Sequence, residues 1–366
     1  MTEYRMQGPV GARTLINDRE CDYFSGTGYL GLQNHPQVLA AAAQCLNRYG
    51  LSTATSRGGY GEHPVFDQLT REVCGFFGRD GLLSFPSGYM GMSVLAQGLK
   101  LDYDQIFVDD ESHFSILDAA RLSGKPVQLF RHLDAGALRE CMYASIKARE
   151  RALILSDGVF PISGEICPLL DYLKVLDEFA GVIALDDAHA VGVLGENGRG
   201  VQDFWKVNDE RVWSSATLSK ALGGYGGVIC ETKQRTAHVA AFTKVLSGAS
   251  PISLPVAAAS AQALRLARTQ TQLRERLWEN VRFMRAGLRN LGWTMVDSPI
   301  PILCLPWRDG LDLAIIQESL FQQNICVAHV RNYSSTPPGG AIRIAVFSTH
   351  SQPQMERLLG ALAAFS

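Results

Sequence analysis

The 366-residue sequence lacks any run of basic residues and carries almost no net charge. Its 34 lysines and arginines stand against 36 aspartates and glutamates, a net charge of −2. Nucleic-acid binding rests mainly on clustered positive charge, so a nucleic-acid partner is not expected. No apolar stretch reaches the roughly 18–20 residues of a membrane span, and residues 1–13 lack the apolar core of a signal peptide. We therefore expect no membrane contact and a cytoplasmic location.

Patterns typical of metal sites and disulfide frameworks are also missing. The eight cysteines and eight histidines are scattered, with no C-x-x-C pair and no H-E-x-x-H motif. We therefore expect reduced thiols and no bound metal. Hydrophobic residues at 46% and charged residues at 19% are ordinary globular composition, which excludes a disordered or collagen-like chain.

Seven short apolar runs alternate with amphipathic segments between about residues 80 and 230. Each run has four to six residues bounded by Gly, Pro or Asp, as expected of strands buried on both faces; they are 82–85, 106–109, 127–130, 152–157, 182–187, 212–217 and 227–230. Helical patterns fill most gaps, at 64–78, 88–100, 112–123, 134–147 and 168–179. The alternation predicts an α/β fold with a mostly parallel seven-stranded sheet between helices.

The pattern changes after residue 227. A long helix is predicted over 272–291, strands over 300–305, 325–330 and 342–347, and a last helix over 353–364. The length also exceeds the ~100–200 residues of a usual single domain. We predict an N-terminal segment (1–45), a large cofactor-binding domain (46–245) and a smaller α+β C-terminal domain (246–366), with a ligand crevice between the two domains.

Three loops at the carboxyl ends of predicted strands, where open α/β sheets bind ligands, carry suggestive residues. Residues 87–91 open a helix, and small residues there leave backbone N–H groups for an anion such as phosphate. Asp186 and Asp187 end a buried strand, where two acids are costly unless a positive group meets them. Lys220 follows the strand 212–217 among hydroxyl and glycine residues, from which its amine can reach the crevice.

Taken singly, each of these features has an ordinary alternative: a solvated lysine, a capping aspartate or a loop histidine. A metal ion and a protonated ring nitrogen are both open as partners of the acids, although no further metal ligands stand at suitable spacing. Together, an acid for a heterocycle nitrogen, an amine for a carbonyl, and amides with hydroxyls for a phosphate are what pyridoxal 5′-phosphate (PLP) requires. The set therefore favours a PLP enzyme.

Colinear motifs along nearly the whole chain resemble those of the α-oxoamine synthases, which are fold-type-I PLP-dependent transferases. The family includes 8-amino-7-oxononanoate synthase and 2-amino-3-ketobutyrate CoA ligase. The motifs are YFSGTGYLGLQNHP (23–36), Arg57, Gly61, Leu69, SGYMG (87–91), DDESHFSI (109–116), DGVFPISGEICPL (157–169), the segments 186–200 and 217–227, and IRIAVFSTH (342–350). The resemblance implies an acyltransferase that condenses an amino acid with an acyl-CoA or acyl-carrier thioester and releases carbon dioxide, giving an α-aminoketone.

The resemblance also implies roles for residues around the PLP ring. Lys220 would bind the cofactor aldehyde covalently and later move the Cα proton of the substrate. Asp186 would pair with the pyridine nitrogen and keep it protonated. His113 would stack on the ring, with a helix-capping role as its alternative, and His189 would hydrogen-bond the phenolic oxygen.

Further roles concern the phosphate and the substrate. The Gly88 and Tyr89 amides and the Thr217 hydroxyl would bind the phosphate, which Ser250 would reach from the partner subunit of a homodimer. A site at the subunit interface is implied. The substrate residues would be Arg343 and Ser334. The planar guanidinium of Arg343 can donate two parallel hydrogen bonds to the amino-acid carboxylate. Ser334 stands at the position of a substrate-contacting hydroxyl.

Departures from the family pattern lie on the substrate side. Thr27, Pro161 and Phe66 stand where the family has asparagine, serine and histidine, and the chain begins roughly where the family's N-terminal helix has ended. These changes leave open another fold-type-I enzyme, such as an aminotransferase or decarboxylase acting without acyl-CoA. A non-catalytic scaffold is a further alternative. Small amino acids (Gly, Ala, Ser) are expected as substrates by analogy alone.

Overall fold

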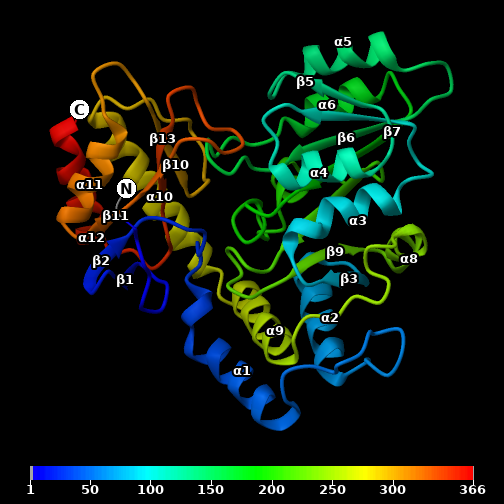
Figure 1. The fold of residues 1–366 in the computed structure, drawn as a ribbon, viewed down its shortest axis with the longest axis horizontal. Helices are drawn as coiled ribbons and strands as arrows, with labels where there is room; N and C mark the ends of the chain where they lie inside the picture. The colour runs from blue at the N-terminus through cyan, green and yellow to red at the C-terminus, as the bar shows by residue number, and fades with distance from the viewer. Residues whose placement is uncertain (1–2, 366) are drawn as a thin grey trace.

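A seven-stranded sheet forms the centre of the larger unit in the computed structural model, which describes residues 3–365 (Figure 1). Its strands lie in the order β3-β9-β8-β7-β6-β4-β5, and β9 runs opposite to the other six. The predicted α/β fold with a mostly parallel sheet is thus confirmed, and every strand lies within one residue of its predicted bounds. The strands are β3 (Gly81–Phe85), β4 (Gln105–Asp109), β5 (Val127–Phe130), β6 (Ala152–Asp157), β7 (Gly181–Asp186), β8 (Val212–Thr217) and β9 (Gly227–Glu231).

Helices cover both faces of this sheet. Because side chains alternate along a strand, Leu153 and Leu155 belong to one buried cluster and Ile154 to another on the opposite face. The predicted helix over 88–100 begins with a 3-10 turn, η2 (Gly88–Met90), before α3 (Gly91–Gly98). The other helices of this unit are α2 (Pro64–Phe77), α4 (Phe114–Leu122), α5 (Ala135–Ser145), α6 (Leu169–Leu176), α7 (Val201–Trp205) and α8 (Lys233–Phe242).

The smaller unit contains two three-stranded sheets. The antiparallel sheet β10-β13-β12 consists of β10 (Ile302–Pro306), β13 (Ala341–Ala345) and β12 (Ala328–Val330), and it packs with α10 (Gln272–Asn290), α11 (Leu313–Gln322) and α12 (Gln352–Leu362). The second sheet joins β11 (Ile325–Cys326) to β1 (Arg13–Ile16) and β2 (Arg19–Tyr23). The single strand predicted over 325–330 is therefore wrong, because its two halves pair in different sheets.

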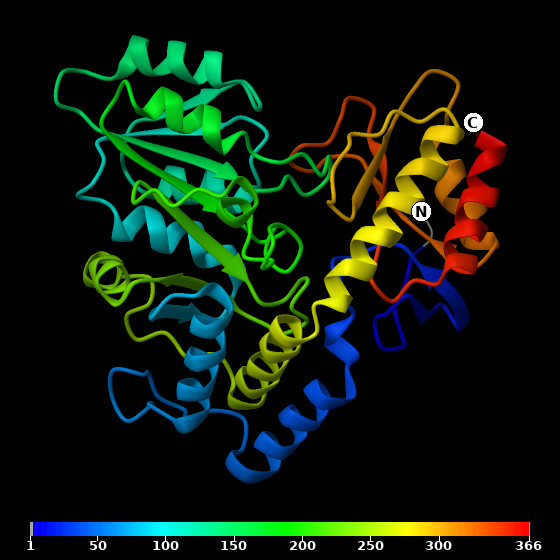
Figure 2. The ribbon, with the colours of Figure 1, turned by 180° about the vertical axis from the view of Figure 1, so that it is seen from behind.

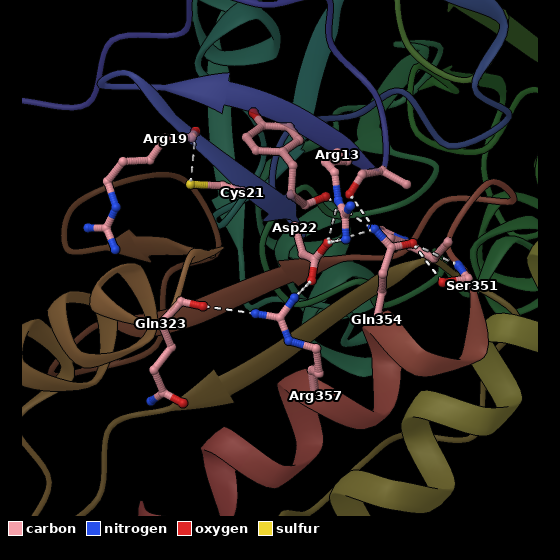
Figure 3. A network of polar contacts seen from close by, with 11 residues as sticks. Arg13, Arg19, Cys21, Asp22, Gln323, Ser351, Gln354 and Arg357 are labelled. Atoms are coloured by element: carbon pink, nitrogen blue, oxygen red, sulfur yellow. Dashed lines mark hydrogen bonds and ion pairs between the residues drawn. The ribbon is translucent and has the colours of Figure 1, made fainter.

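The N-terminal hairpin β1–β2 is tied to the C-terminal helix by a buried carboxylate (Figure 3). The side chain of Asp22 is fully buried and accepts hydrogen bonds from Arg13 Nε (3.2 Å), Gln354 Nε2 (2.8 Å) and Arg357 Nη1. A buried charge is tolerated only when it is paired in this way. The two ends of the chain therefore pack as one body.

Two consecutive helices connect the units, α9 (Leu254–Thr269) and α10, drawn in yellow shades in Figure 2. Helix α9 packs against α1 (Pro36–Tyr49) and α2. Buried alanines such as Ala257 and Ala261 allow this close approach. No helix within residues 3–365 is long and apolar enough to cross a membrane.

Candidate active site

The carboxyl ends of β6, β7 and β8 bring two acids and a lysine together. Asp157 and Asp186 are register partners at the ends of β6 and β7, and β8 ends at Thr217, three residues before Lys220. Both acids are buried, and their charges act on the Lys220 amine. This edge of the sheet is the place where an open α/β fold binds its ligand.

The Lys220 amine is poised to react as a nucleophile. Burial and, less strongly, the Arg343 charge lower the pKa of Lys220 to about 8, against the opposing influence of Asp186 and Asp157. A lowered pKa increases the share of neutral amine at neutral pH, which is the form that attacks a carbonyl.

The two buried acids outnumber the lysine that faces them. Burial raises the pKa of Asp186, while the Lys220 charge, the Ala188 amide (3.0 Å to Oδ1) and His113 lower it. Burial and the Asp186 charge raise the pKa of Asp157 well above its usual value, although the backbone N–H of His113 donates to it at 2.7 Å. A second positive group, such as a protonated ring nitrogen, would satisfy this excess of carboxylate.

Asp187 has a different role from its neighbour. Successive residues of a strand point to opposite faces, and Asp187 accepts from the backbone N–H of Val201 at 3.4 Å and from Ser214. Burial raises its pKa to about 7. Asp187 therefore accepts from the first backbone amide of α7.

His113 caps a helix next to the cluster around Lys220. Its Nδ1 accepts from the backbone N–H of Ser115 at 3.2 Å, which caps α4. Burial lowers its pKa, while the charge of Asp186 raises it and that of Lys220 lowers it. His113 is therefore a helix cap that also belongs to the same cluster as Lys220.

His189 and Arg343 are joined through Tyr29. Arg343 Nη2 donates to the Tyr29 hydroxyl (3.2 Å), so the proton of that hydroxyl is available to His189 Nδ1, which lies 2.8 Å away. Burial lowers the pKa of His189 well below its usual value. The neutral ring then carries its proton on Nε2, as a donor to a ligand oxygen.

Arg343 is a buried cation whose hydrogen-bond partners are neutral. It lies on β13 with 6% of its surface exposed. Nε donates to the carbonyl of Pro161 (2.7 Å) and Nη1 to that of Gly26 (3.1 Å). Because a guanidinium has five N–H groups, these bonds and the bond to Tyr29 leave one N–H on each terminal nitrogen. Such a pair matches the two oxygens of a carboxylate.

The backbone of Gly88 lies directly against the Thr217 side chain, and we call this pair the Gly88–Thr217 cradle. A Cβ atom on Gly88 would lie only 2.7 Å from Thr217 Oγ1, so the backbone approaches the hydroxyl closely here. Thr217 Oγ1 in turn lies 2.7 Å from the hydroxyl of Ser219. The Tyr89 amide donates to Ser87 Oγ at 3.3 Å, and the Tyr89 hydroxyl donates to Asp118 at 2.5 Å. Hydroxyls and amides in this arrangement can hold a phosphate group.

Two predicted residues lie elsewhere or lack a partner. Ser250 is exposed and lines a hollow of about 510 Å³ together with Arg57 and Ser84. The Ser334 hydroxyl is buried without a hydrogen-bond partner among the described residues. Within residues 3–365, no cluster of three or more His, Cys, Asp or Glu side chains has the arrangement of a metal site.

Each departure from the family pattern has a defined place in the structure. Pro161, which has no N–H, contributes its carbonyl to Arg343. Phe66 is buried on α2 beneath the guanidinium of Arg57, 5.1 Å from the ring centroid. The carbonyl of Thr27 accepts from the Tyr29 amide at 2.9 Å.

Sequence reasoning missed three residues of this cluster. Asp157 and Tyr29 stand inside the motifs at 157–169 and 23–36, and the end of a buried strand was a signal for Asp157. Tyr333 lies next to His113 in the structure, but nothing in its local sequence indicates this contact.

Comparisons with known proteins agree with this geometry. The model of the aminotransferase class I and II family matches residues 24–362. The 8-amino-7-oxononanoate synthase of Nitrosococcus oceani is 34% identical over 361 residues, 98% of this chain and 94% of the relative. Its namesake from Alkaliphilus oremlandii is 28% identical over 353 residues, 96% and 89% of the two chains.

The same fold occurs in a solved structure. A serine palmitoyltransferase from S. paucimobilis, with bound PLP and myriocin, superposes with a TM-score of 0.92 at 23% identity, covering 99% of this chain and 92% of the other. The predicted fold-type-I architecture is confirmed. The chain belongs to the aminotransferase class I and II family and, within it, to the α-oxoamine synthases.

Proposed function

We propose that this protein is a PLP-dependent acyltransferase that condenses an amino acid with an acyl thioester, carried by coenzyme A or a carrier protein, and releases carbon dioxide. The product is an α-aminoketone. The observation that carries the proposal is the half-buried Lys220, on which the charge of Asp186 acts, with two N–H groups of Arg343 unpaired in the same cluster. Full-length relatives named 8-amino-7-oxononanoate synthase support the acyltransferase over an aminotransferase.

The residues present fit PLP. The excess of buried carboxylate suits a ring N–H, the neutral His189 offers Nε2–H to a phenolic oxygen, and the Gly88–Thr217 cradle suits a phosphate. PLP, when bound, supplies an electron-withdrawing ring that stabilises negative charge at the Cα atom of an amino acid.

The side chains of this chain would divide the remaining work. The Lys220 amine would hold the cofactor aldehyde carbon and take the Cα proton of the amino acid, for which its lowered pKa suits it. Asp186 would keep the ring nitrogen protonated, and His113 would cover the ring. The Arg343 fork would hold the substrate carboxylate, with the Ser334 hydroxyl beside the substrate.

We further propose a homodimer in which Ser250 reaches the phosphate of the partner's site. Its exposure on the loop before α9 supports this reading. We also propose a cytoplasmic location. We further propose three parts of the chain: an N-terminal segment (1–45), a large cofactor-binding domain (46–245) and a smaller C-terminal domain (246–366). The central sheet lies wholly between residues 81 and 231, in agreement with a large domain there.

The test is a reaction panel with purified, PLP-loaded protein. Each small amino acid is paired with acyl-CoA donors of different length, and release of free thiol and of carbon dioxide is measured. The proposal predicts that both products appear only when both substrates are present, and that neither appears with Lys220→Ala. A keto acid formed without thiol release would instead identify an aminotransferase.

A further inference from the structure

Tyr333 belongs to the smaller unit but contacts the larger one. It lies in the loop between β12 and β13, where its backbone N–H donates to Thr336 Oγ1 at 3.1 Å and its carbonyl accepts from the Thr336 amide at 3.2 Å. The ring packs edge-on against Phe114, with centroids 5.4 Å apart, and lies 5.6 Å from the ring of His113. The loop therefore holds an aromatic side chain over the start of α4.

The hydroxyl of Tyr333 is one of three polar groups that meet the His113 ring. It lies 2.7 Å from His113 Nε2, while the Ser115 hydroxyl (2.7 Å) and the Ser115 amide (3.2 Å) meet Nδ1. A backbone amide can only donate, so Nδ1 must be the unprotonated nitrogen. In the neutral ring Nε2 therefore carries the proton and donates it to the Tyr333 oxygen.

Charged residues around Lys220 also act on the Tyr333 hydroxyl. Burial and the charge of Asp157 raise its pKa, Arg343 lowers it and Asp186 raises it, so these groups lie within electrostatic reach. The hydroxyl stays protonated at neutral pH. Its oxygen accepts from His113 Nε2.

We propose that Tyr333 is a positioning residue of this active site, which fixes the His113 ring in one plane and in its Nε2–H form. Ser115 holds one ring nitrogen from α4 and Tyr333 holds the other from the smaller unit, so the ring is held from both units. The link to the reaction rests on the proposed function, in which His113 covers the cofactor ring. The contacts themselves are a property of the protein alone.

The consequence is that the orientation of His113 depends on a contact between the two units. Without the hydroxyl, Nε2–H has lost its acceptor, while the backbone cap on Nδ1 remains. Both contacts to Ser115 hold Nδ1, so the ring can tilt about that end while its Nε2 end is no longer held. Misplacement by about 1 Å of a group that orients a reaction can cost about 100-fold in rate.

The experiment compares Tyr333→Phe with Tyr143→Phe, whose lost hydroxyl donates to Glu178 at 2.8 Å on the surface. Protein with ¹⁵N-labelled histidine rings is studied by NMR with and without added PLP, and a His113→Gln variant assigns the His113 signals. We expect a protected Nε2 proton in the wild type and in Tyr143→Phe, and loss of that protection in Tyr333→Phe. Ser115→Ala should keep the same tautomer, because the backbone amide still donates to Nδ1.

Kinetics supply the second measurement. Tyr333→Phe should lower kcat about 10- to 100-fold and leave the KM for the amino acid unchanged, since Arg343 is untouched. An unchanged His113 signal, or an unchanged kcat, in Tyr333→Phe would overturn the proposal. If the wild type transfers no acyl group, the proposed function fails, and the ring signal alone decides whether Tyr333 positions His113.

Discussion

Removal of the Arg343 guanidinium should weaken amino-acid binding through the carboxylate alone. Three of its N–H groups are bound to Pro161, Gly26 and Tyr29, so two remain for a carboxylate in a site that is nearly closed to water. A hydrogen bond to a charged group contributes about 1.5–3 kcal/mol. Because the contributions of two such bonds do not add fully, Arg343→Ala should weaken the free energy of amino-acid binding by about 2–4 kcal/mol. This corresponds to an increase of about 30- to 1000-fold in Kd.

The assay titrates PLP-loaded protein with an amino acid and follows the visible absorbance of the cofactor. The same titration is repeated with the matching amine that lacks the carboxylate. Arg343→Ala should raise the Kd for the amino acid by the stated factor and leave the Kd for the amine unchanged. Tyr29→Phe removes one hydrogen-bond partner of Arg343 and keeps the guanidinium itself, so it should weaken amino-acid binding less than Arg343→Ala does. Equal weakening of both ligands by Arg343→Ala would refute the carboxylate assignment.

Three further predictions concern the site and its support. The rate of PLP capture by the cofactor-free protein should rise with pH through about 8, the pKa of Lys220, and then level off; a rise continuing to pH 10 in stopped-flow absorbance would contradict the lowered pKa. Asp186→Asn should keep PLP but lower kcat at least about 100-fold, measured by thiol release, since an amide cannot stabilise the ring N–H charge. Asp22→Asn should lower the free energy of unfolding by about 1–3 kcal/mol in urea titrations, because two half-exposed arginines lose a buried partner; an unchanged midpoint would show that the hairpin is held by other contacts.

The central sheet was predictable because strands buried on both faces appear in the sequence as short, continuous apolar runs. Runs such as 152–157 have no polar alternation, so their limits coincide with β6. The reversed direction of β9 has no such signature, since direction depends on pairing with β8 and β3.

The hairpin β1–β2 escaped prediction for an identifiable reason. Its strands, RTLI and RECDY, are rich in charged residues, and two of the three partners of Asp22, Gln354 and Arg357, lie more than 300 positions away. The turn at Asn17 and Asp18, with φ of 48° and 59°, is the local signal that could have indicated it.

The candidate site was predictable in its motif residues and not in its contacts. Lys220, Asp186 and Arg343 stand in motifs, and the fold brings them within electrostatic reach of one another. The bond between His113 and Tyr333 joins residues 220 positions apart in different units, a relation that depends on how the units pack.

The central claim is that Lys220 is the residue that binds PLP covalently. The most direct measurement is to reduce the PLP-loaded protein with borohydride, digest it and locate the modified peptide by mass spectrometry. The account predicts a single pyridoxyl group, on Lys220. Modification of another lysine, or none after incubation with excess PLP, would contradict it.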